Sequence, residues 1–189
     1  MDITTRDRIQ SEQIRTLFSQ SLMSVGGHLF SGIVIVILLW ATEPMGELVG
    51  WLSMLILASI IRILLTRYYL RLDPPIDEWS RGGTVGVAHS TVFGLIWGAA
   101  CILLLNMNDP VSVVVIGTVI LSLNAGSAST TASYPPSFYA FAASTLVPLL
   151  WVAIGSGTPM GFALAVLAAF TITLALPLFC LNIHRVFER

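Results

Sequence analysis

The chain has 189 residues, of which 56% are hydrophobic and only 10% are charged, and its mean hydropathy is +0.87. A soluble domain carries roughly 25% charged residues, so the composition excludes an ordinary soluble domain and indicates an integral membrane protein. The formal net charge of −1 gives no indication of nucleic-acid binding, and we expect none.

Taken from the N-terminus, the chain begins with a polar stretch and continues with six apolar ones. In residues 1–16, Arg8, Glu12 and Arg15 fall at helical spacing and predict an amphipathic cytoplasmic lead-in helix. Each apolar stretch approaches or exceeds the ~17–25 residues that cross a bilayer. We therefore expect a transmembrane domain over 17–183, with spans over 17–40, 48–65, 84–105, 111–133, 138–154 and 161–183. Residues 184–189 would begin a cytoplasmic linker.

The positions of the charges predict the orientation of these spans. With six spans and the N-terminus inside, every arginine falls on or near the cytoplasmic side, as the positive-inside rule requires. The charged residues left for the outer loops are then Glu43, Glu47 and Asp109. The predicted fold is an all-α, integral membrane bundle of six transmembrane helices with both termini cytoplasmic.

Small residues predict where these helices approach one another. From Ala125 to Ser133 every side chain is small, so we expect 121–136 to be the inner half of a central helix, contacted on several sides and ended by Pro135 and Pro136. Two steps of small residues four apart lie in the spans: Gly94 with Gly98, and Ser122 with Gly126. They predict close helix packing, either within one bundle or at a dimer face.

Polar residues inside the spans are the candidate ligand-binding residues. His28, His89 and Asn124 all fall in the inner half or near the middle of the bilayer, where polar groups usually face the bundle interior. Together with Ser127 they are predicted to line one pocket. Two alternatives stay open: each side chain forms an isolated hydrogen bond to a neighbouring helix, or the two histidines bind haem or another metal. No single helix has metal-ligand spacing, so we predict no metal and no cofactor.

Two prolines lie inside predicted helices. Pro148 and Pro177 each remove one backbone hydrogen bond, which predicts either a static bend or a hinge. Cys101 and Cys180 are expected at different depths and as free thiols. We find no catalytic set of residues, so we expect no enzyme activity from this chain.

Motif residues spread through the chain resemble those of the multi-pass N-terminal membrane regions that precede GGDEF, EAL or histidine-kinase modules in bacterial signalling proteins. The matching residues are Gln13-Ile14-Arg15-Thr16-Leu17-Phe18, Trp40, Trp51, Arg67-Tyr68-Tyr69, Trp79, Gly94, Trp97-Gly98, Ala125-Gly126-Ser127-Ala128, Pro136-Ser137-Phe138-Tyr139-Ala140-Phe141 and Leu146-Val147-Pro148. The GGDEF loop and the kinase histidine region are not among the 189 residues.

This resemblance implies a sensory input domain in the bacterial inner membrane. It would bind a small or lipophilic signal, or sense the membrane itself, and pass the change through its sixth helix to a cytoplasmic output module. The resemblance also implies a homodimer. Two other functions stay open: a small transporter or channel, which the lack of acidic residues inside the spans disfavours, and a haem or metal carrier that uses His28 and His89.

Overall fold

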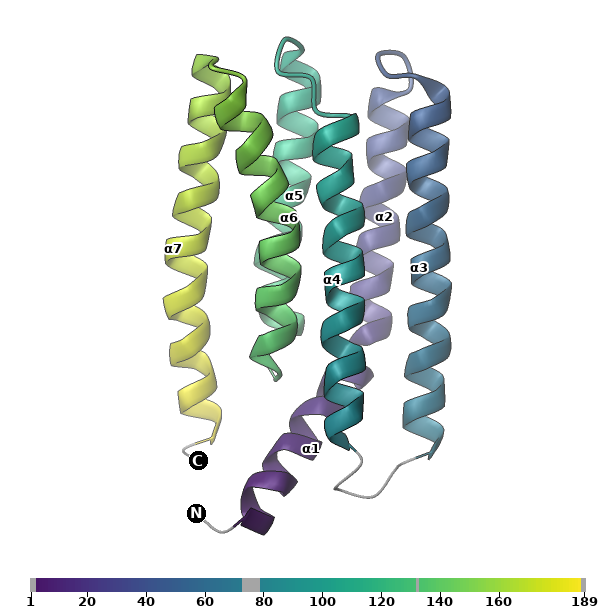
Figure 1. Cartoon of the computed structure of the whole chain (residues 1–189), viewed down its shortest axis with the longest axis vertical. Coiled ribbons are helices and arrows are strands. Elements are labelled where there is room, and N and C mark those ends of the chain that lie inside the picture. The colour runs from purple at the N-terminus through teal and green to yellow at the C-terminus, as the bar shows by residue number, and fades with distance from the viewer. Residues whose placement is uncertain (1–2, 73–78, 132, 188–189) are drawn as a thin grey trace.

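The computed structural model describes residues 3–72, 79–131 and 133–187, and it describes side chains in 9, 11–71, 81–131 and 133–174. All the regular structure in these residues is helical, and most helices run side by side (Figure 1). The helices are α1 (Ile3–Ser19), α2 (Ser21–Leu39), α3 (Met45–Leu72), α4 (Trp79–Leu103), α5 (Pro110–Thr130), α6 (Pro135–Gly155) and α7 (Pro159–Phe187).

The prediction of a helical membrane bundle is confirmed. Five of the described helices are long and apolar enough to cross a bilayer: Ser21–Leu39, Met45–Arg71, Arg81–Leu103, Pro110–Thr130 and Pro135–Gly155. The described part of α7 adds a shorter apolar helix over Pro159–Leu174. Six spans and the orientation of the termini remain predictions.

Two helix boundaries differ from those expected. The lead-in helix is expected to end at residue 16, but it continues to Ser19, and the first apolar helix starts at Ser21. Pro135 and Pro136 do not end a helix; they occupy the first turn of α6, where a missing N–H costs nothing. The preceding helix ends at Thr130.

The N-terminal helix crosses the lower end of α4 (Figure 1). Ile14, Leu17 and Phe18 form its buried face, each at most 1% exposed. Glycines on α4 permit this contact. A Cβ added to Gly86 would lie 2.9 Å from Leu17 Cδ2, and one added to Gly82 would lie 3.4 Å from Ile14 Cγ2. The amphipathic pattern in the polar N-terminal stretch therefore anchors α1 on the bundle.

The central helix is α4, and the prediction that residues 121–136 form the inner half of the central helix is wrong. In the apolar 18-residue stretch of α4, 56% of the residues are buried inside the bundle. The corresponding share is 33% in each of the other four spans. Ala125, Gly126 and Ser129 on α5 are exposed. These small residues of α5 therefore form part of the outer surface and do not lie against another helix.

Large side chains fill the interior of the bundle and also cover its outside. Trp51 of α3 and Trp97 of α4 are at most 1% exposed and meet edge to face with ring centroids 5.1 Å apart. Met23, Phe30 and Trp151 are among the apolar side chains on the outside, each more than two-thirds exposed. An apolar outer surface of this kind suits contact with lipid.

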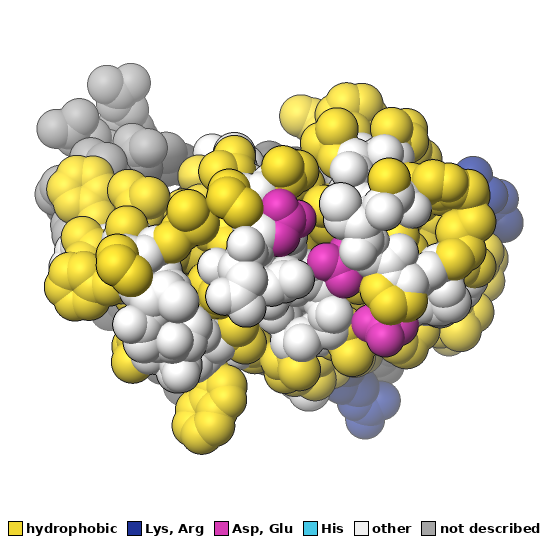
Figure 2. Space-filling view, turned by 90° about the horizontal axis from the view of Figure 1, so that it is seen from above, with side chains coloured by type: hydrophobic (Ala, Val, Ile, Leu, Met, Phe, Trp, Pro, Cys, Tyr) yellow, Lys and Arg dark blue, Asp and Glu magenta, His cyan; other side chains and the backbone are white. Residues whose placement is uncertain are grey.

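Acidic side chains gather at the end of the bundle where α2 meets α3 and α4 meets α5, seen from above in Figure 2. Asp109 caps α5 by accepting hydrogen bonds from the backbone N–H groups of Val111 and Ser112. Burial raises the pKa of the Glu43 carboxyl above its ordinary value, and the charges of Asp109 and Glu47 raise it further.

This raised pKa predicts a pH-dependent effect of Glu43→Gln. The unfolded chain ionises Glu43 more readily than the folded one, so Glu43 lowers the stability as pH rises from its ordinary pKa through the raised value. Glu43→Gln should raise the thermal midpoint in detergent slightly at pH 8 and not at pH 4. Glu12→Gln, at an exposed position on α1, is the control. A gain that is equal at both pH values would contradict this repulsion.

Candidate functional site

His28 of α2 lies in an aromatic environment built by two other helices. Its ring centroid is 4.7 Å from that of Phe93 and 5.5 Å from that of Phe141. The indole N–H of Trp97 donates to His28 Nδ1 at 3.0 Å. Because the indole nitrogen can only donate, the neutral His28 ring carries its proton on Nε2. That N–H has no hydrogen-bond partner among the described residues.

His89 of α4 makes a different contact, toward α3. Its Nε2 lies 3.2 Å from the carbonyl oxygen of Ala58. A carbonyl oxygen only accepts, so Nε2 carries the proton in this contact. His89 is not among the lining residues of the three hollows that are described in the following paragraphs. It fits the alternative of an isolated hydrogen bond between neighbouring helices.

Asn124 joins α5 to α6 within the bundle. Its side chain and that of Thr145 exchange hydrogen bonds, with Nδ2 donating to Oγ1 at 3.0 Å and Oγ1 lying 3.2 Å from Oδ1. Asn124 Nδ2 also donates to the carbonyl oxygen of Ile120 at 2.9 Å. The amide is 2% exposed and satisfied, so it holds the two helices together.

A small cavity, which we call the polar cavity, lies among α2, α3, α4, α5 and α6. Its volume is about 30 Å³. The residues that line it are Ser24, Val25, His28, Arg62, Ser90, Phe93, Ser127, Thr131 and Phe141. Of the four predicted pocket residues, His28 and Ser127 line this cavity, while Asn124 and His89 are not among its lining residues.

Sequence reasoning missed Arg62 as a site residue. The predicted span over 48–65 places it three residues from the inner end, but α3 continues to Leu72. Arg62 is only 8% exposed. The signal in the sequence is its isolation, because no other charged residue stands between Glu47 and Arg67.

Two larger hollows open on either side of α5. The α2–α5 groove, of about 270 Å³, shares Ser24, His28 and Ser127 with the polar cavity. It is lined in addition by Met23, Gly27, Phe30, Ser31, Ser122, Leu123, Gly126 and Thr130.

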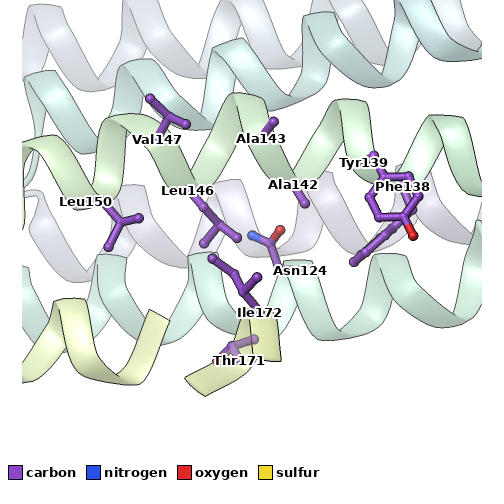
Figure 3. Close-up of a pocket in the computed structure, with 10 residues that line it drawn as sticks. All are labelled: Asn124, Phe138, Tyr139, Ala142, Ala143, Leu146, Val147, Leu150, Thr171 and Ile172. Atoms are coloured by element: carbon purple, nitrogen blue, oxygen red, sulfur yellow. The ribbon is translucent and has the colours of Figure 1, made fainter. Parts of the chain in front are cut away.

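The second hollow is the α6–α7 groove, of about 280 Å³. Its lining is mainly apolar: Asn124, Phe138, Tyr139, Ala142, Ala143, Leu146, Val147, Leu150, Thr171 and Ile172. In Figure 3 the Asn124 amide lies between Leu146 of α6 and Ile172 of α7.

The two steps of small residues lie in different environments. A Cβ added to Gly94 would lie 2.8 Å from the carbonyl oxygen of Phe141 on α6, so Gly94 lies in a helix contact. Gly98 lies in the same contact, described with Pro148 below. Gly126 has no atom within 4 Å of such a Cβ, and Ser122 is exposed. Packing within one bundle is therefore a wrong prediction for Ser122 and Gly126.

Pro148 lies inside α6 at the contact with α4. It leaves the carbonyl of Ser144 without its helical donor, and a Cβ added to Gly98 would lie 2.6 Å from that oxygen and 2.8 Å from Pro148 Cγ. Whether Pro148 acts as a hinge stays a prediction. The side chains of Pro177 and Cys180 lie outside the described residues.

The described residues also bear on the thiols and on metal binding. Cys101 is buried and free. The described part of the chain contains no group of three or more His, Cys, Asp or Glu residues that could hold a metal ion.

Comparisons with protein-family models, with curated proteins and with solved structures give no match for this chain. The resemblance to membrane regions of signalling proteins therefore stays a hypothesis.

Proposed function

We propose that this chain is a membrane-embedded sensory input domain. It binds a small or lipophilic signal at the polar cavity and the adjoining α2–α5 groove, and α5 passes the change to α7. The cytoplasmic end is the end that carries Arg67, Arg71 and Arg81, in agreement with the positive-inside rule. A cytoplasmic output module beyond α7, a homodimer and a location in the bacterial inner membrane belong to the same proposal.

One observation carries this proposal: α5 borders a ligand-sized space on each side. Ser127 of α5 lines the polar cavity and the α2–α5 groove. Asn124, three residues earlier, lines the α6–α7 groove together with Thr171 and Ile172 of α7 (Figure 3). A ligand that moves α5 from the first side therefore changes the space that α7 borders on the second.

Direct packing between α5 and α7 supports this coupling. Gly117 of α5 faces Leu164 of α7, and a Cβ on Gly117 would lie 2.8 Å from Leu164 Cδ1. Leu164 is only 6% exposed. A close contact of this kind transmits a shift of one helix to the other, because packed side chains leave little free space.

The test measures whether α7 moves with the lipid environment. Nitroxide labels at Leu57 of α3 and Phe170 of α7, each 59% exposed, report the distance between the two helices. The labels are placed in a variant without the two native cysteines. We expect the distance distribution in nanodiscs of a bacterial polar lipid extract to differ from that in synthetic phosphatidylcholine, because a signal shifts the population between two packings.

Matched variants on α5 localise the response. Ser127→Leu fills the polar cavity and should abolish the difference between the two lipids. Ser129→Leu, at an exposed position that lines none of these hollows, should preserve it. Identical distance distributions in both lipids for the parent protein would count against a sensory role.

A further inference from the structure

Arg62 is a buried cation on a membrane-spanning helix. It lies in the apolar span Met45–Arg71 and is 8% exposed. Its Nε donates to Ser21 Oγ at 2.8 Å, and its guanidinium carbon lies 5.7 Å from the centre of the Phe18 ring. Within the described residues it forms no ion pair with a carboxylate. An arginine keeps its charge in proteins, and a buried charge without a counter-charge is costly.

The polar cavity beside Arg62 is lined by hydrogen-bond donors and has no acid in its lining. The Nε2–H of His28 and the hydroxyls of Ser24 and Ser90 have no hydrogen-bond partner among the described residues. Cationic and neutral donors without a competing carboxylate suit an anion, which accepts short, charge-assisted hydrogen bonds.

The size of the polar cavity limits the anion. One water needs about 10–15 Å³ of such space, so the cavity's volume of about 30 Å³ has room for roughly two or three non-hydrogen atoms. A carboxylate group has three such atoms. A phosphate group has five, so it is too large for this cavity as it stands.

The α2–α5 groove leads from this cavity to the lipid-facing side. Ser24, His28 and Ser127 line both spaces, so the two adjoin. Met23 and Phe30, which line the groove, are 74% and 69% exposed. A hydrocarbon chain that lies in the groove therefore has its head beside Arg62.

We propose that the polar cavity and the α2–α5 groove bind a long-chain carboxylate, with the carboxylate at Arg62 and the hydrocarbon chain along Gly126. This inference rests on the proposed function, because it names the chemical class of the signal for the same site. It explains why the cavity that holds a buried arginine adjoins a groove lined by small residues of α5, since Ser122 and Gly126 leave room for the chain.

Oleate and four related probes test the charge and the tail separately. The purified 189-residue protein is titrated in a non-ionic detergent with oleate, methyl oleate, sodium acetate, sodium chloride and phosphatidic acid, and the thermal midpoint is followed. We expect oleate to raise the midpoint at the lowest concentrations and methyl oleate to have no effect. If acetate or chloride acts as strongly as oleate, the site holds a free small anion and the amphiphile proposal is wrong. If phosphatidic acid acts more strongly than oleate, the head group is a phosphate and the proposal is also wrong.

Variants at the two ends of the site provide the controls. Arg62→Met should weaken oleate binding about tenfold to a hundredfold, while Arg62→Lys should retain part of it. Arg67→Met, at an exposed position on the same helix, should bind like the parent. Gly126→Leu, which leaves Arg62 intact, should weaken oleate binding and leave any acetate effect unchanged. Equal oleate affinity in Arg62→Met and Arg67→Met would overturn the proposal.

A photoreactive fatty acid with a mid-chain diazirine locates the hydrocarbon chain directly. Crosslinks should map to 23–31 and 122–130. Crosslinks confined to 138–150 would place the ligand in the α6–α7 groove and overturn the proposal.

The nitroxide distances between α3 and α7 distinguish failure of this inference from failure of the proposed function. Arg62-dependent binding of oleate without movement of α7 would support the site and contradict the sensory role. Movement of α7 that does not depend on Arg62 would support the sensory role and contradict the site at Arg62.

Discussion

Gly98→Leu is expected to lower the thermal midpoint of the bundle by roughly 5–10 °C. Any side chain at this position meets the Ser144 carbonyl oxygen at 2.6 Å and the Pro148 ring at 2.8 Å. A backbone atom cannot rotate away, so α4 and α6 must separate. Helix pairs in a bilayer depend on close packing of this kind, because lipid gives them no hydrophobic drive to associate.

Gly126→Leu is the matched control for this change. It introduces the same side chain into a helix and gains the same intrinsic helix propensity, but nothing lies within 4 Å of the added Cβ. Its midpoint should be equal to or slightly above that of the parent protein. Thermal unfolding in detergent measures both variants, and a loss at Gly126 as large as the loss at Gly98 would contradict the arrangement of α4 and α5.

Trp97→Ala should cost about 3–5 kcal/mol of stability. The Trp97 side chain is fully buried, packs edge to face against Trp51, and donates to His28. Its removal opens a cavity among α2, α3 and α4 and leaves His28 Nδ1 without a donor. Trp97→Phe retains part of the packing and should cost less, and the difference between the two variants isolates the volume of the ring.

Trp151→Ala provides the control for this truncation. Trp151 lies on α6 and is 79% exposed, so its loss removes a lipid-facing ring and leaves the interior packed. We expect less than about 0.5 kcal/mol. Denaturant titration followed by circular dichroism compares the two variants. If both truncations cost the same, the indole of Trp97 does not fill the core as described.

The sequence predicts the helices of this fold well and their faces poorly. The apolar stretches identify the spans because a bilayer core requires about 20 apolar residues. In a bilayer the lipid-facing and buried sides are both apolar, so periodicity does not separate them. The small residues of α5 therefore predict a central position in the bundle, although Ala125, Gly126 and Ser129 are exposed. Gly94 and Gly98 have the same kind of spacing and do lie against another helix.

The candidate site shows the same limit at single residues. Depth along the bilayer can be counted from the sequence, and it groups His28, His89 and Asn124, of which only His28 lines the polar cavity, together with Ser127. The sequence does not show which neighbouring helix a side chain faces. Depth alone therefore predicts one pocket for Asn124 and His89, although they contact different helices. Arg62 was missed because α3 extends seven residues past its expected end, which adds about 10 Å of helix below it.

The contact of α4 with α6 constrains the order in which the chain can assemble. The two helices are separated in sequence by the whole of α5. During synthesis α4 is therefore complete before α6 exists, and Gly94 and Gly98 have no helix against them at that time. The carbonyl of Ser144 and the ring of Pro148 arrive only with α6. Until then the glycine face of α4 lacks the close contact that fixes it, so the packing of the central helix is completed only after α6 has entered the membrane.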